Sequence, residues 1–360
     1  MAPYHPIAQQ QMSTTSELQV LSTAAFSGMF AFFVSIAATR AIETYGGQRG
    51  GLLAALPTTV VPASFGFARV AGLALFGAAP SEARLPFLYA SLFTVPGGTL
   101  ASSLFLVAWR YAPPHLPSSL SFSASLLAMC ALSLAVWFLG ASVLIAISRG
   151  IGNPVAFGLL AFFAQLAAAA SVTWRHVDAP KGSAPVPLGM MAMRGVLSGV
   201  AIFIAVLLSS VGGDIAAMAS AFPAIFMSIQ VALWISQGRA VQGGAVGPVM
   251  LGVSSVGLYA MLFAASAPAL GMLPAMLTSW VASVALASLP AYTYLTWRGS
   301  VAAQERGPAQ EQEPAQEQGP AAPAQPTFAL DAPLHPVGAS GGGSAGWDEG
   351  ELPVAGRPHA

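Results

Sequence analysis

Hydroxyl groups and helix breakers lie together inside an apolar part of the chain, in the segment YGGQRGGLLAALPTTVVPAS at 45–64. The residues concerned are Gly46, Gly47, Pro57, Thr58, Thr59 and Pro62. A proline inside a helix removes a backbone hydrogen bond, and a bilayer tolerates broken backbone only against protein or a water-filled cavity. The segment therefore predicts either a packing and kinking element or the lining of a substrate pathway, in which the threonine hydroxyls would contact a solute.

A second segment, LFTVPGGTLASSLF at 92–105, has the same character. Its helix breakers are Pro96, Gly97 and Gly98, and Thr99, Ser102 and Ser103 follow them. We expect it to be a second candidate lining, with GAVGPVMLGVSSVGLY at 244–259 as its counterpart. Two glutamines inside apolar runs, Gln165 and Gln230, are expected to form hydrogen bonds between helices.

Charged residues near the apolar runs are few, so each one can be weighed. Asp214 follows Gly212 and Gly213 and opens an apolar run, where a carboxylate caps a helix and faces its positive dipole end. A coupling-ion or substrate role is the alternative for Asp214. Arg69 would be costly facing lipid at depth, so we expect it at an interface, with contact to an anionic solute as the alternative.

The sequence lacks the groups that covalent chemistry needs. All five histidines lie in tails or loops without metal-ligand spacing, and the one cysteine, Cys130, excludes an intrachain disulfide. There is no phosphate-binding Walker loop. The stretch SVGGD at 210–214 differs from the GxGD motif of intramembrane aspartyl proteases at Val211, and a second intramembrane aspartate is missing. We therefore expect no enzyme activity, no cofactor and no metal.

Composition indicates an all-α polytopic integral membrane protein. The chain is 55% hydrophobic and 7% charged, with mean hydropathy +0.69, whereas soluble domains carry about 25% charged residues. Because a spanning helix needs about 20 apolar residues, the sequence predicts about nine spans. They are 18–39, 51–68, 86–109, 120–148, 154–174, 191–210, 215–236, 245–266 and 271–297. The second is the least secure, since Arg69 interrupts it before the apolar run resumes.

Two of the apolar segments resemble each other. GGQRGGLLAALP at 46–57 aligns without a gap on GGDIAAMASAFP at 212–223, so that Pro57 matches Pro223. Both follow one span and open the next, and a shift of five spans reverses direction across the membrane. The pattern predicts an inverted repeat of two four-helix units, about 18–148 and about 191–297, joined by a linker helix at about 154–174. Inverted repeats are the plan of many secondary transporters.

The distribution of charge predicts an orientation. With nine spans, nine Lys and Arg residues lie in loops on one side and three, Arg69, Arg84 and Arg149, on the other. The positive-inside rule then places the N-terminus outside and the C-terminus in the cytoplasm. Residues 1–17 are expected to be a disordered segment. Residues 299–360 carry repeated GPAQEQ-type and Gly/Ser tracts and are expected to be a disordered tail.

These patterns together favour a secondary transporter or permease for a small neutral or anionic solute. The glycine-rich turn leading to a proline resembles small-anion and sulfur-compound exporters over about a dozen residues, and no function is carried over from it. The expected partners are the lipid bilayer and the solute, a homo-oligomer is compatible with the sequence, and the formal net charge of zero argues against nucleic acid. Two alternatives remain: a non-transporting scaffold or receptor subunit whose tail recruits partners, and an integral-membrane enzyme acting on lipid.

Overall fold

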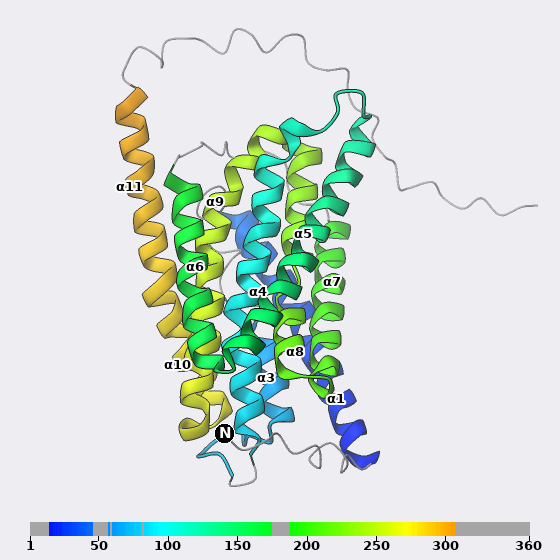
Figure 1. Cartoon of the computed structure of the whole chain (residues 1–360), viewed down its shortest axis with the longest axis vertical. Helices are drawn as coiled ribbons and strands as arrows, with labels where there is room; N and C mark the ends of the chain where they lie inside the picture. The colour runs from blue at the N-terminus through cyan, green and yellow to red at the C-terminus, as the bar shows by residue number, and fades with distance from the viewer. Residues whose placement is uncertain (1–13, 46–56, 58–59, 81–82, 175–187, 307–360) are drawn as a thin grey trace, which may run out of the picture. The chain divides into compact units, whose positions relative to one another are not determined.

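The computed structural model describes residues 14–45, 57, 60–80, 83–174 and 188–306 (Figure 1), and every regular element in these ranges is helical. The longer helices are α1 (Thr14–Tyr45), α3 (Val60–Val70), α4 (Leu85–Tyr111), α5 (Phe122–Ile151), α6 (Pro154–Trp174), α7 (Leu188–Leu207), α8 (Gly213–Ser220), α9 (Ala224–Leu270), α10 (Met272–Ser283) and α11 (Leu289–Arg306). A π-helical stretch, Val284–Ser288, joins α10 to α11. Short 3-10 turns, Pro113–His115 and Leu208–Ser210, follow α4 and α7.

Eight helical segments within the described residues are long and apolar enough to cross a membrane. They are Glu17–Ala37, Leu85–Tyr111, Phe122–Ile151, Pro154–Trp174, Met191–Ser210, Gly213–Val231, Gly243–Leu270 and Met272–Ala302. These eight segments indicate a multi-pass integral membrane protein. Each corresponds to one of the predicted spans. The remaining prediction, 51–68, is represented only by the 11-residue helix α3, and residues 51–56 and 58–59 lie outside the described part of the chain.

The turn between α5 and α6 follows directly from its sequence. Ser121 caps the start of α5 by accepting a hydrogen bond from the Ala124 N–H at 3.2 Å. Gly152 ends α5 in the left-handed conformation, with φ 65°, which glycine adopts without the strain other residues carry. Asn153 then accepts from the Ala156 N–H at 3.1 Å, and α6 begins at Pro154, where a missing N–H costs nothing.

Helix α9 is continuous by backbone geometry, but the chain reverses direction within it. In its first part, Trp234 packs edge-on against Trp109 of α4 at 5.6 Å between ring centroids. In its second part, Gly247 lies against Thr173 near the same end of the bundle, whereas Gly257 lies against Pro96, halfway down α4. The ribbon of α9 accordingly turns over near the top of Figure 1. The predictions of separate spans at 215–236 and 245–266 therefore match two crossings.

The first and third predicted spans run in the same direction. Helix α1 is antiparallel to α7, since Gly28 meets Gly199 while Phe32 meets Gly195. Helix α7 ends beside the start of α4, because Gly213, which opens α8, lies against Ser91. The end of α1 and the start of α4 therefore lie at opposite ends of the bundle, and α3 lies between them in the sequence.

Helix α4 and the second half of α9 form the centre of the bundle (Figure 1). Within their apolar windows, 78% and 72% of the residues are buried, against 17% for α5. The exposed side chains of α5 are large and apolar, among them Leu127, Phe138 and Leu139. A surface of this kind is stable only in lipid or against another protein, so α5 lies on the outside of the bundle.

Candidate functional site

The crossing made by α8 and the first part of α9 is broken in the interior of the bundle. Helix α8 ends at Ser220, and α9 begins at Ala224 after Pro223. The break leaves the Ala221 carbonyl group outside regular helix, and the Ser102 hydroxyl of α4 donates to it at 2.6 Å. Trp137 of α5 in turn donates to the Ser102 oxygen at 3.3 Å. Neighbouring helices thus supply the hydrogen bonds that a helix break needs in a membrane.

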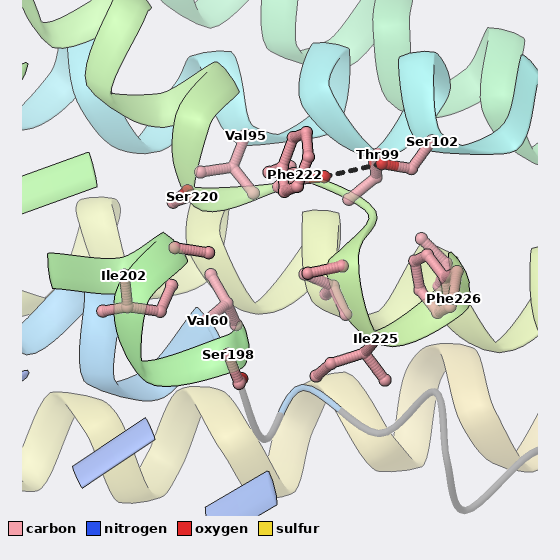
Figure 2. A pocket seen from close by; sticks show the side chains of 15 residues that line it. Val60, Val95, Thr99, Ser102, Ser198, Ile202, Ser220, Phe222, Ile225 and Phe226 are labelled. Carbon is pink, nitrogen blue, oxygen red and sulfur yellow. Dashed lines mark hydrogen bonds between the residues drawn. The ribbon is translucent and has the colours of Figure 1, made fainter. Parts of the chain in front are cut away.

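A cavity lies beside this break (Figure 2). Its lining comes from α3, α4, α7, the break, α9 and the end of α8. The lining residues are Val60, Val95, Thr99, Ser102, Ser198, Ala201, Ile202, Ser220, Ala221, Phe222, Ala224, Ile225, Phe226, Val253 and Val256. They are apolar apart from four hydroxyl groups, and none is charged. Figure 2 draws the bond from Ser102 to the break as a dashed line above the cavity.

The cavity lies near the midpoint of the spans that surround it. Its residues on α4 centre on position 98 of Leu85–Tyr111, and Ser198 is central in α7. Centres of water molecules can occupy about 50 Å³, and each water needs about 10–15 Å³ by this measure. The space therefore holds roughly three to five waters, which matches a solute of a few atoms.

A buried glutamine connects the helices beside the cavity. Gln165 of α6 is fully buried, and its side-chain amide donates to the Met250 carbonyl of α9 at 3.0 Å. Its oxygen lies 3.2 Å from the Thr99 hydroxyl of α4. Thr99 has one proton to donate, either to Gln165 or to the Pro96 carbonyl at 2.9 Å. The prediction that Gln165 bonds between helices is confirmed.

Comparisons with known proteins add no family to this geometry: no family model, no curated protein and no solved structure matches the chain. The site must therefore be interpreted from its own chemistry. Among the described residues, no group of three or more His, Cys, Asp or Glu side chains is placed to hold a metal ion. The hydroxyls, carbonyls and backbone N–H groups around the cavity are suited to binding a small polar solute by hydrogen bonds.

The predicted site residues of the first Gly/Pro segment fall partly outside the described chain. Four of them lie outside the described residues: Gly46, Gly47, Thr58 and Thr59. The prediction that these four line a substrate pathway therefore stays untested. Pro57 is buried in a turn and Pro62 is buried in the first turn of α3. Helix α3 is held against α9 by a 2.9 Å hydrogen bond between Ser64 and Tyr259. Its first residue, Val60, faces the cavity.

The second predicted segment packs directly beside the cavity. A side chain at Gly97 would collide with Phe157 of α6 and Met218 of α8, and one at Gly98 would collide with Ala221. Both glycines therefore allow helices to approach closely. Pro96 lies inside α4 and packs against Gly257 of α9. The neighbouring residues, rather than these three, line the cavity.

The remaining predicted residues lie mostly at the end of the bundle, away from the cavity. Gly212 precedes α8, and Gly213 lies in its first turn. Asp214 forms an ion pair of 2.7 Å with Arg149 at the end of α5. Arg69, in the last turn of α3, is 3.5 Å from the Leu73 carbonyl oxygen. Pro223 differs from these residues, since it opens α9 directly beside the cavity.

One residue of the site, Ser198, and one residue near it, Arg194, were not predicted from the sequence. Ser198 of α7 is 3% exposed and lines the cavity, and Arg194, one helical turn before it, is 5% exposed. The available signal was an arginine within the first residues of an apolar run, a placement that generally marks function in membrane helices.

Proposed function

We propose that this chain is a secondary transporter or channel-like permease for a small neutral or anionic solute, and that it is not an enzyme. The observation that carries the proposal is the helix break at Ala221 beside a central cavity. Discontinuous helices that meet at the midplane are the typical substrate sites of secondary transporters. The cavity has room for only a few waters, which suits a small solute.

An inverted repeat of two four-span units supports this proposal. Four pairs of spans would be equivalent. Helix α1 matches α7, and α3 matches α8 together with the first part of α9. Helix α4 matches the second part of α9, and α5 matches α10–α11. The contacts between helices agree with this matching. Helix α1 packs against α3, and its equivalent α7 packs against α8. In the same way α4 packs against α5 and α9 against α10, while α5 packs against α8 and α10 against α3. The equivalent pairs α1–α7 and α4–α9 pack against each other, as around a two-fold axis.

The linker helix α6 is consistent with the same symmetry. A shift of 152 positions carries Pro96 onto Pro248, and Ser102 and Ser103 onto Ser254 and Ser255. It carries Thr99 to position 251, one residue from the Met250 carbonyl. The two partners of Gln165 are therefore near-equivalent positions of the two repeats. We infer that α6 lies close to the axis that relates them.

In this proposal the cytoplasmic side is the end at which α4 and α6 finish. Arg110 and Arg298 lie at that end, and Arg298 donates to the Trp174 carbonyl while its guanidinium is 4.7 Å from the Trp174 ring centre. Arginines and tryptophans of this kind gather at the membrane interface. The N-terminus is then outside and the C-terminus is in the cytoplasm.

A flux measurement with a blockable cavity tests the proposal. Cys130 is replaced by Ser, Thr99→Cys is added, and the protein is reconstituted in liposomes. The liposomes swell as a solute enters them, and light scattering records this swelling. The solutes are urea, glycerol and potassium salts, the last with valinomycin so that potassium can follow the anion. At least one solute should enter faster than in empty liposomes, and a methanethiosulfonate reagent should block its entry. The matched variant Ser142→Cys, on the exposed surface of α5, should be insensitive. Absence of transport for every solute, measured both as net entry and as exchange between loaded liposomes and the medium, would refute the proposal.

A further inference from the structure

The first turn of α9 lies beside the cavity and carries backbone donors without an acceptor in the helix. Ile225 and Phe226 both line it, and the first N–H groups of a helix have no partner within the helix. The next N–H, of Met227, donates to Pro223 at 2.8 Å. No residue in the described part of the chain accepts from Ile225 or Phe226. This helix end also carries partial positive charge.

An independent donor reaches the cavity from α7. The Ser198 side chain is 3% exposed and lines the cavity (Figure 2). Within the described ranges it forms no hydrogen bond, whereas Ser220 and Ser102, which share the lining, donate to the Ala217 and Ala221 carbonyls. A hydroxyl that lines the cavity without a protein partner can donate its proton to a ligand there.

A buried positive charge lies one helical turn from this hydroxyl. Arg194 and Ser198 are four residues apart, so they lie on the same face of α7. Arg194 is 5% exposed, and a guanidinium keeps its charge even when buried. Charges act over longer distances in a low-dielectric interior than in water. The lining itself contains no acidic side chain.

We propose that the cavity binds a small monovalent anion, with the Ser198 hydroxyl and the N–H groups of Ile225 and Phe226 as its donors. Arg194 supplies positive potential without being required to touch the ion. The space for roughly three to five waters admits chloride, nitrate or formate and excludes sugars and nucleotides. This inference rests on the proposed permease function and specifies that the solute is an anion.

The liposome assay separates this inference from the permease function. Potassium chloride, nitrate and formate with valinomycin report anion entry, and urea and glycerol report neutral entry. We expect anion entry to fall about tenfold in Ser198→Ala, in line with loss of a hydrogen bond to a charged group, and further in Ser198→Asp. Ser142→Ala is the matched control. Arg194→Gln should slow anion entry, and Arg194→Lys should restore most of it.

A binding measurement covers the case of a strictly coupled exchanger, which shows no net entry. Thermal unfolding of the purified protein is compared in potassium nitrate and in potassium gluconate, an anion too large for the cavity, at equal ionic strength. Stabilisation by nitrate that is lost in Ser198→Ala supports the inference. Entry of neutral solutes alone, without nitrate stabilisation, overturns the anion site and leaves the permease proposal standing. Anion entry or stabilisation that is unchanged in both Ser198 variants also overturns it.

Discussion

The contact between α4 and the helix break offers the sharpest test of the site geometry. A methyl group added at Gly98 would lie 2.6 Å from the Ala221 methyl, whereas carbon atoms prefer about 3.5–4.0 Å. Gly98→Ala must therefore displace the break by about 1 Å. Overpacking of this kind costs about 1–3 kcal/mol, and the better helix propensity of alanine returns about 0.5–1 kcal/mol. The expected net loss is about 0.5–2 kcal/mol.

The same displacement would disturb the bond that Ser102 donates to Ala221, so solute flux should fall as well. Unfolding is measured by titrating the protein in mixed micelles with denaturing detergent, and flux by liposome swelling. Gly140→Ala is the matched control. Its added methyl has one tight contact, with the end of the Leu104 side chain at 3.1 Å, and that side chain can move; its other neighbour, Ala101, is at ordinary contact distance.

The double variant Gly98→Ala/Ala221→Gly makes this prediction specific. Removing the Ala221 methyl creates room for the one added at Gly98, so stability and flux should both return toward the original values. A favourable coupling of about 0.5 kcal/mol or more is the sign of residues in contact. If Gly98→Ala costs no more than Gly140→Ala, or if the double variant is no better than the single one, the close approach of α4 to the break is wrong.

Three further predictions concern other parts of the bundle. Gln165→Leu should lower the free energy of unfolding by about 1 kcal/mol in the same assay, because two interhelical hydrogen bonds are worth about 0.6 kcal/mol each in membranes and Thr99 keeps the Pro96 carbonyl as an acceptor. A loss above about 3 kcal/mol would contradict this reasoning. Asp214→Asn should cost less than about 1 kcal/mol, because Arg149 is 61% exposed, and a larger loss would indicate a stronger pair. Val211→Cys, in a cysteine-free background, should react with a membrane-impermeant maleimide in intact cells; reaction only after the cells are opened would reverse the proposed orientation.

Most of the spans could be predicted because hydrocarbon imposes a simple length rule. An apolar run of about 20 residues has one stable outcome in a bilayer, and eight of the predicted runs appear as helices of that length. The reversal inside α9 was also foreseen, since the polar stretch SQGRAVQGG at 236–244 separates two runs. Hydropathy gives neither the neighbours nor the tilt of a span, because lipid and buried protein surfaces are equally apolar.

The apolar run that contains α3 lies only partly in the described chain. The run was predicted as one span over 51–68; the structure describes the helix α3, Val60–Val70, and residues 51–56 and 58–59 lie outside the described residues. Its buried residues pack against protein, with Gly66 against Val206 of α7 and Ser64 bonded to Tyr259 of α9. These contacts join α3 to residues far along the chain, so the hydropathy of the run does not predict them.

The cavity itself depends on contacts that no local pattern contains. The helix breakers Pro96 and Pro223 were predicted as site residues, and both lie beside the cavity. The residues that line the cavity, however, are determined by how five separate segments meet. Ser198 lies in GVLSGV, where Gly195 and Gly199 face α1 and identify that side as a packing surface. A helix that buries one face against α1 must turn another toward the bundle interior. Ser198 is on that other face, and since a hydroxyl there needs a partner, the glycine spacing is the feature that singles this serine out from the many others in the chain.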